Sequence, residues 1–175
     1  MLAGMEQGTL YKIPVSVLVV IHSADLEILL LERADRPGYW QSVTGSRDAE
    51  DEALIETAIR EVHEETGILV EPSSTAGDAA PWVVPAQNML DWHHSIEYEI
   101  YAQWRARYAP GVTRNTEHWF SLRVPHRFGV RLSPREHLHS VWLPLEEAAQ
   151  RCFSPSNRDA ILELPERLRT IAKAQ

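Results

Sequence analysis

One segment of the chain, from Gly45 to Ile68, constrains the fold and the chemistry more than any other. It reads GSRDAEDEALIETAIREVHEETGI. Residues 52–66 have the spacing of an amphipathic helix, in which each residue is turned by about 100° from the one before it. Glu61, Glu64 and Glu65 therefore share one wedge, about 100° wide, at the end of the helix. The side chains expected to dock on a core fall on the adjoining face: Leu54, Ile55, Ala58, Ile59 and Val62.

This placement of three carboxylates does not stabilise a helix. Like charges three and four residues apart repel each other by about 0.2–0.5 kcal/mol per pair, and acids in a last turn oppose the helix dipole by about 0.3–1 kcal/mol. Gly67 fits the position directly after that turn. Two interpretations remain open, a solvated acidic surface and a metal site. The second is favoured by the apolar stripe beside the acids and by the use of carboxylates and substrate phosphates as Mg²⁺ ligands.

The composition is that of a soluble globular protein. Of the 175 residues, 44% are hydrophobic and 24% charged, which predicts one domain over residues 1–175 with a loose terminus over residues 1–10. The net charge of −8 argues against a nucleic-acid-binding surface. The single cysteine, Cys152, fits a reducing compartment, and the apolar run 13–21 is too short to span a bilayer. We therefore expect a cytoplasmic protein with no membrane or nucleic-acid partner.

Hydrophobic patterns predict strands on both sides of the central helix. The expected strands are 14–21, 27–32, 39–44, 96–104, 116–124 and 140–143. A short helix is expected over 145–152, and a final helix from Arg158, capped by Asn157 and bent or divided at Pro165. Residues 71–85 contain prolines and small residues and are expected to form a variable loop. This order predicts an α/β fold with a mixed sheet between helices.

A basic segment stands out in this acidic chain. Between Tyr101 and Arg135, seven arginines face a single acid, Glu117, which leaves a local charge of +6. The arginines are Arg105, Arg107, Arg114, Arg123, Arg127, Arg131 and Arg135. Because arginine binds phosphate groups through a rigid fork of donors, phosphates are expected to approach here. For most of the seven, a solvated edge remains the simpler interpretation.

The segment 45–68 resembles the Nudix box, G-x5-E-x7-R-E-U-x-E-E-x-G-U, where U is a bulky apolar residue. The matching residues are Gly45, Glu52, Arg60, Glu61, Glu64, Glu65 and Gly67. Six residues separate Gly45 from Glu52, where the pattern has five. We interpret the difference as a one-residue insertion before the helix, because a loop tolerates an insertion better than a helix does.

Four further motifs extend this resemblance over residues 11–162. They are YWQSVTGS at 39–46, RYAPGVTRNTE at 107–117, Glu136-His137-Leu138 followed by Trp142-Leu143, and Ser156-Asn157-Arg158. Together they look like the bacterial dihydroneopterin triphosphate pyrophosphohydrolase branch of the Nudix family. The longer segment 71–85 and the extended termini depart from that branch. The resemblance implies an α/β/α sandwich and the hydrolysis of dihydroneopterin triphosphate to the monophosphate and pyrophosphate, a step towards folate.

The resemblance also implies roles for particular residues. The metal ligands would be Glu61, Glu65 and Glu136, joined by Glu64. Arg60 would orient the carboxylates through salt bridges, and Glu52 would bond within the box. The substrate would be bound by Lys12, Arg33, Thr44, Tyr98, Tyr101 and Ser154. Tyr98 or Tyr101 could stack on a flat heterocycle, although an aromatic residue in an alternating strand is more often part of the core. The implied cofactor is Mg²⁺, with Mn²⁺ as an alternative.

The implied reaction is attack by water on a phosphorus atom of a small polyphosphate, with the metal neutralising charge. One of the carboxylates would accept the proton, and Glu136 is our first choice. Two alternatives stay open. The first is a pyrophosphohydrolase of nucleoside triphosphates with broader specificity. The second is a Nudix-fold binding module without catalysis, against which the presence of all three box carboxylates argues. The sequence does not determine the oligomeric state.

Overall fold

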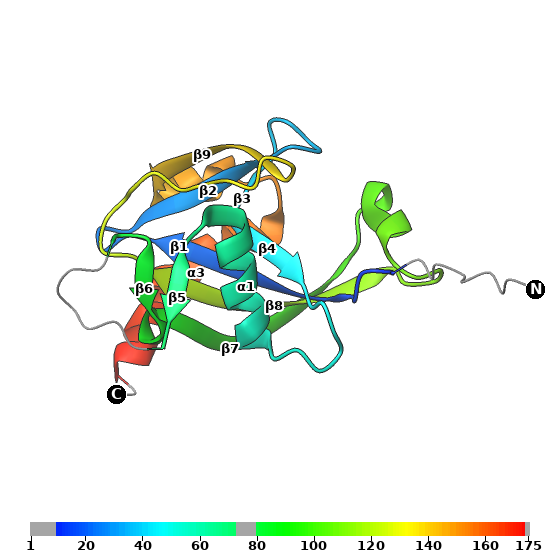
Figure 1. The fold of residues 1–175 in the computed structure, drawn as a ribbon, viewed down its shortest axis with the longest axis horizontal. Coiled ribbons are helices and arrows are strands. Elements are labelled where there is room, and N and C mark those ends of the chain that lie inside the picture. The colour runs from blue at the N-terminus through cyan, green and yellow to red at the C-terminus, as the bar shows by residue number, and fades with distance from the viewer. Residues whose placement is uncertain (1–9, 73–79, 174–175) are drawn as a thin grey trace, which may run out of the picture.

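The computed structural model describes residues 10–72 and 80–173. Within these ranges the centre is a mixed seven-stranded sheet, with α1 on one face and α2 and α3 on the other (Figure 1). The strands are β1 Val15–His22, β2 Glu27–Arg33, β3 Trp40–Gln41, β4 Val43–Ser46, β7 Met89–Glu99, β8 Arg114–Arg123 and β9 His137–Pro144. Their order is β3-β2-β1-β8-β7, while β4 also pairs with β1 and β9 with β2. The predicted α/β class is confirmed.

Strand β1 joins the two cores of the molecule. It pairs in parallel with β8 along its whole length, from Val15 opposite Thr116 to His22 opposite Arg123. Because successive side chains of a strand point to opposite faces, Val17, Val19 and Ile21 pack in the core beneath α1, whereas Leu18 and Val20 pack beneath α2 and α3. The near-continuous apolar sequence of β1 is thus explained by burial on both faces.

Three α-helices pack on the sheet, and the first of them, α1, ends at a glycine. Helix α1 spans Leu54–Thr66, so that it begins two residues later than predicted and ends as predicted, and it buries Ala58 and Val62. It ends at Gly67, whose φ of 74° is left-handed and suits glycine. Helix α2 spans Leu145–Arg151, and α3 spans Pro155–Lys173. Among the described residues, no helix is long and apolar enough to cross a membrane.

The start of α3 corrects a prediction about Asn157. The helix begins at Pro155, and the Asn157 N–H donates to Ser154 Oγ over 3.2 Å, so Ser154 supplies the cap. Asn157 lies inside the helix, where its buried side chain accepts from Ser42 N–H and donates to Ser42 Oγ. Pro165 also lies within α3, and the helix continues through it.

The predicted loop over residues 71–85 is wrong at both ends. Strand β5 spans Leu69–Glu71 and pairs in parallel with β6, Val83–Pro85. Val84 is fully buried in the core beneath α1, which explains why this short strand is held in place. Residues 73–79 lie outside the described residues.

Other predicted strands also have different bounds. The strand expected over 140–143 is longer and runs from His137 to Pro144. The strand expected over 96–104 runs instead from Met89 to Glu99, and residues 102–107 form a short 3-10 helix, η2. A second one, η1, spans Ala86–Asn88. The strand expected over 39–44 is divided at Ser42, because β3 pairs with β2 whereas β4 pairs with β1. This division turns the chain from one strand pair to the other.

Candidate active site

The three carboxylates at the end of α1 have different surroundings. Glu65 is only 5% exposed, the Glu61 side chain is 12% exposed, and the Glu64 side chain is 51% exposed. All three line one large cavity, of about 1080 Å³. The predicted acidic wedge is therefore not a solvated surface: two of its members are withdrawn from water.

Gly45 makes room for one of these acids. A Cβ atom built on Gly45 would lie 1.8 Å from Cδ of Glu61. Gly45 belongs to β4, and the Glu61 carboxylate lies directly against the backbone of that strand. The motif therefore requires glycine at this position for a steric reason, because any larger residue would displace the Glu61 carboxylate.

Arg60 is hydrogen-bonded to several parts of the box. Its Nη1 donates to Glu61 Oε1 and its Nε to Glu52 Oε1, both over 2.9 Å, and its Nη2 donates to the carbonyl of Ser46, also over 2.9 Å. Glu52 in turn accepts from the Asp48 N–H over 2.8 Å. This bond closes the loop that contains the extra residue. The hydrogen bond from Arg60 lowers the pKa of Glu52 to about 2, so Glu52 stays ionised.

Glu61 and Glu65 have the opposite electrostatic character. Burial, with Glu65 as the second cause, raises the pKa of Glu61 to about 8 in spite of the adjacent Arg60. Burial also raises the pKa of Glu65, against the opposing effect of His137. Two adjacent buried acids with raised pKa values indicate that the protein alone provides too little positive charge to ionise both. A bound cation would supply it.

Glu136 and His137 approach Glu65 from another part of the chain, at the start of β9. Ligand atoms of Glu65, Glu136 and His137 all lie within 4.8 Å of one another. His137 Nε2 is 3.2 Å from Glu65 Oε2, yet neither of these buried atoms makes a hydrogen bond. Carboxylate oxygens suit Mg²⁺ and Mn²⁺, and an imidazole nitrogen suits transition metals. These residues therefore fit a divalent metal.

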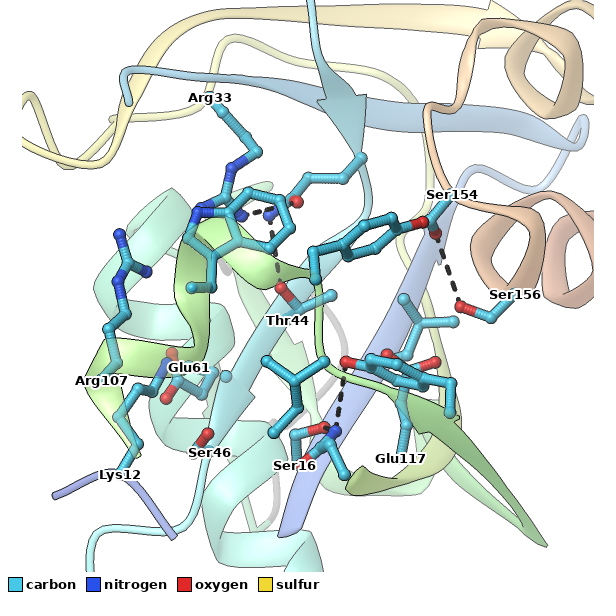
Figure 2. Close-up of a pocket in the computed structure, with 18 of the residues that line it drawn as sticks. Lys12, Ser16, Arg33, Thr44, Ser46, Glu61, Arg107, Glu117, Ser154 and Ser156 are labelled. Carbon is cyan, nitrogen blue, oxygen red and sulfur yellow. Dashed lines mark hydrogen bonds between the residues drawn. The ribbon is translucent and has the colours of Figure 1, made fainter. Parts of the chain in front are cut away.

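The cavity brings the predicted substrate-binding residues together. It is lined by all six of them: Lys12, Arg33, Thr44, Tyr98, Tyr101 and Ser154. Figure 2 shows Lys12, Arg107 and Glu61 along one side of the cavity and Ser154, Ser156 and Glu117 along the other. Of the predicted box residues, Glu52 and Gly67 do not line it, since they shape the loop and the end of the helix.

The cationic side of the cavity is suited to phosphate. Desolvation lowers the pKa of Lys12, and the neighbouring charge of Arg107 lowers it further. Arg33 is held by two bonds to Asp35, of 2.7 and 2.8 Å, and lies over the Trp104 ring. Of the seven arginines in the basic segment, only Arg105, Arg107 and Arg135 line the cavity. The other four lie elsewhere, as expected for a solvated edge.

An aromatic cluster lies in the wall of the cavity, next to Arg33. Tyr101, Trp104 and Phe153 have ring centroids between 5.4 and 6.1 Å apart. Tyr101 is 39% exposed and is free to contact a ligand. Tyr98 is half-buried, and its hydroxyl accepts a hydrogen bond from Asn115 over 3.1 Å. Tyr101 is therefore better suited than Tyr98 to stack on a heterocycle.

Sequence reasoning missed several of the lining residues. His137 was not predicted as a site residue, although it directly follows Glu136 in the Glu136-His137-Leu138 motif. Glu117 was noted only as the single acid among arginines, yet it lies buried in the cavity wall. Membership of the Thr-Arg-Asn-Thr-Glu motif was the available signal for Glu117.

Comparisons with known proteins agree with this geometry. A family model described as the NUDIX domain matches residues 12–164. The chain is 44% identical to dihydroneopterin triphosphate diphosphatase of Escherichia coli over 152 residues, covering 86% of this chain and 91% of that protein. It is 40% identical to the enzyme of that name from Haemophilus influenzae, with coverage of 86% and 87%.

Solved structures give the same result. The structure of the E. coli dihydroneopterin triphosphate pyrophosphohydrolase matches with a TM-score of 0.73 and 44% identity, over 86% of this chain and 94% of that one. An Ap4A hydrolase from Caenorhabditis elegans, at 20% identity and a TM-score of 0.62, shares the fold over 89% of this chain and 98% of its own. Five of the seven box residues line one cavity, and the NUDIX model matches residues 12–164, so the chain belongs to the Nudix family.

Proposed function

We propose that this protein is a divalent-metal-dependent pyrophosphohydrolase that converts dihydroneopterin triphosphate to dihydroneopterin monophosphate and pyrophosphate, a step towards folate. One observation carries the proposal: a cluster of acids suited to a divalent metal lies in the same cavity as Lys12 and Arg107. The relatives that bear this activity in their name are 40–44% identical over 86% of the chain. The metal is proposed to be Mg²⁺, with Mn²⁺ as an alternative.

Each part of the site has a task in this reaction. Glu61, Glu65 and Glu136, with Glu64 at the exposed edge, would hold the metal, which when bound neutralises phosphate charge. Arg60 orients Glu61 through their hydrogen bond. Lys12 and Arg107 offset the remaining charge of the triphosphate. Because the chain carries a net charge of −8, these local cations are needed for an anionic substrate to approach.

The chemical step is the hydrolysis of a phosphoanhydride. Water forms a new bond to phosphorus, the anhydride bond between the α and β phosphates breaks, and pyrophosphate leaves with the bond electrons. Glu136 is proposed to accept the proton of the water. It is the exposed member of the Glu65–Glu136–His137 cluster and can reach a water molecule, whereas Glu65 is buried against His137.

The domain organisation, the partner and the cellular location are also proposed, from the family match and the composition. Residues 1–175 are proposed to act as one domain, since the family match spans 12–164. Its partner is a small polyphosphate and not a nucleic acid, which the acidic net charge supports. A cytoplasmic location is proposed because the single cysteine fits a reducing compartment.

The test is pyrophosphate release from dihydroneopterin triphosphate with Mg²⁺, beside a panel of deoxynucleoside triphosphates. We expect a strong preference for the pterin, and loss of at least about a hundredfold in kcat for Glu65→Gln, since the neutral amide is a poor metal ligand. If nucleotides were turned over equally fast or faster, the proposed pyrophosphohydrolase reaction would stand, but the pterin substrate would be wrong. No metal-dependent hydrolysis of any substrate would indicate a binding module instead.

A further inference from the structure

A buried acid lies in the cavity wall away from the cationic side. Glu117 of β8 is 4% exposed and lines the cavity. In Figure 2 it lies beside Ser16, across the cavity from Lys12 and Arg107. Its neighbours in the sheet are Ser16 on β1 and Ile96 on β7.

The fold does not need an acid at this position. Burial raises the pKa of Glu117 to about 7, and no cation pairs with it among the described residues. Its Oε1 accepts from the Trp119 indole over 3.0 Å, a bond that an amide oxygen would accept equally well. Ser156 is a second hydrogen-bonding neighbour of the carboxylate. A carboxylate has about four acceptor positions, so positions remain for a ligand beside those used by Trp119 and Ser156.

The surrounding residues form a fixed polar floor. Asn115 donates to Ser16 Oγ over 2.7 Å and to the Tyr98 hydroxyl over 3.1 Å, which holds all three side chains in place. Lys12, Arg33 and Arg107 stand on the opposite side (Figure 2). A triphosphate bound on the cationic side would therefore direct its uncharged ring towards Glu117.

We propose that Glu117 selects the heterocycle of the substrate, by accepting two parallel N–H bonds from a 2-amino-4-oxo pyrimidine ring. The proposal rests on the function proposed above and adds a determinant of specificity to it. Such a ring carries a ring N–H next to an amino group, so that one carboxylate accepts from both. Pterins and guanine share this edge. Adenine and cytosine have an acceptor nitrogen beside the amino group, and a carboxylate repels its lone pair.

The substitution Glu117→Gln tests this assignment. Glutamine keeps the shape of the side chain and the acceptor for Trp119, but replaces one acceptor oxygen by a donor, which matches adenine. At pH 8 we expect KM for dihydroneopterin triphosphate and dGTP to rise roughly ten- to hundredfold, the size of a lost charged hydrogen bond. We expect kcat to stay near that of the wild type, and KM for dATP to stay equal or fall. The matched control is Glu97→Gln on β7, whose exposed side chain lies outside the cavity.

A binding measurement separates this proposal from the proposed function. In calorimetry without metal, neopterin should bind the wild type more tightly than adenosine does, and Glu117→Gln should reverse this order, whether or not hydrolysis occurs. An unchanged order in the variant, or no preference in the wild type, would overturn the role of Glu117. A wild type that prefers neopterin but does not hydrolyse the pterin triphosphate would overturn only the proposed function. If Glu117→Gln bound neither probe and had a lower melting temperature, the role of Glu117 would be structural and the proposal would be wrong. We expect the variant to melt no lower than the wild type, because ionisation of the buried Glu117 opposes folding.

Discussion

The missing side chain of Gly45 lets the Glu61 carboxylate lie against β4. In Gly45→Ala the new Cβ would overlap the end of the Glu61 side chain, at 1.8 Å from Cδ. Because that end is flexible, we expect it to move aside, at a cost to folding of about 1 kcal/mol. The moved carboxylate no longer faces the metal site, so activity should fall roughly a hundredfold. Thermal melting and steady-state kinetics measure the two effects separately.

Gly129→Ala is the matched control for this substitution. A Cβ at Gly129 would meet no atom within 4 Å, and the residue does not line the active-site cavity. It should change neither activity nor melting temperature appreciably. Gly45→Ala with full activity would show that the metal site does not need Glu61 in its present position.

The positions of some site residues could be predicted from the sequence, and those of others could not. Glu61 and Glu65 could be placed together because helical spacing fixes their direction. Glu117 could not, since a strand pattern shows which residues share a face but not whether that face meets a core or a cavity. Glu117 shares its face with the buried Trp119. His137 was obscured for a related reason, because its partner Glu65 is 72 positions earlier in the chain.

Among the elements, the start of α3 has a buried polar anchor, Asn157, in addition to the apolar side chains that the helix packs into the core. Asn157 accepts from the Ser42 N–H over 2.7 Å and donates to Ser42 Oγ over 2.9 Å, joining the helix to the break between β3 and β4. In Asn157→Ala the Ser42 N–H would stay buried without a partner. We expect a loss of about 2–3 kcal/mol in the free energy of unfolding, which lowers the melting temperature by roughly 4–12 °C for a chain of this size.

Arg158→Ala provides the comparison on the next residue of α3. Arg158 makes an exposed ion pair with Asp159, and such pairs contribute about 0–1 kcal/mol. The melting temperature of Arg158→Ala should therefore stay within about 4 °C of the wild type. If the two variants melt alike, Asn157 is not the anchor of the helix.

Helices and strands could be predicted where the local apolar periodicity determines their bounds. β1, β2, α1 and α2 lie within two residues of their predicted bounds, because their apolar periodicity is strong. The error at residues 100–104 has a tertiary cause. Residues 96–104 follow the alternating pattern of a strand, but the rings of Tyr101 and Trp104 pack on Phe153, which follows α2, and the chain turns there into η2. The Asn157 error came from a cap that Ser154 and Pro155 provide instead.

At the scale of the whole molecule, the sheet divides the site between its two faces. Glu65 projects from α1, which packs on one face, and Glu117 shares its face with the core beneath α2 and α3. Glu65 and Glu117 both line the one cavity. One substrate can thus contact a metal-binding acid with its phosphates and a buried acid with its ring. The acids also make the fold sensitive to pH and to metal.

The sign of that sensitivity follows from the raised pKa values. The folded pKa of Glu61 is about 8, above the ordinary value of 4.5, and burial raises the pKa of Glu65 as well. A raised carboxyl pKa means that the folded state binds more protons than the unfolded state. The metal-free protein therefore loses stability as the pH rises above about 4.5, until Glu61 is fully ionised above about 8. A divalent metal binds the ionised acids and offsets this loss.

We therefore expect Mg²⁺ to raise the melting temperature more at pH 8 than at pH 6. At a concentration one hundred times its Kd, a ligand of the folded state adds about 2.7 kcal/mol, which corresponds to roughly 5–11 °C here. At pH 6 protons compete with Mg²⁺ for Glu61 and Glu65, so the same concentration of Mg²⁺ should raise the melting temperature less. Glu65→Gln should lose most of the metal effect and, without metal, should melt above the wild type at pH 8. Glu97→Gln, which removes an equal charge outside the cavity, should keep the wild-type response. Equal metal effects at both pH values, or an effect that survives in Glu65→Gln, would mean that the ion binds away from these two acids.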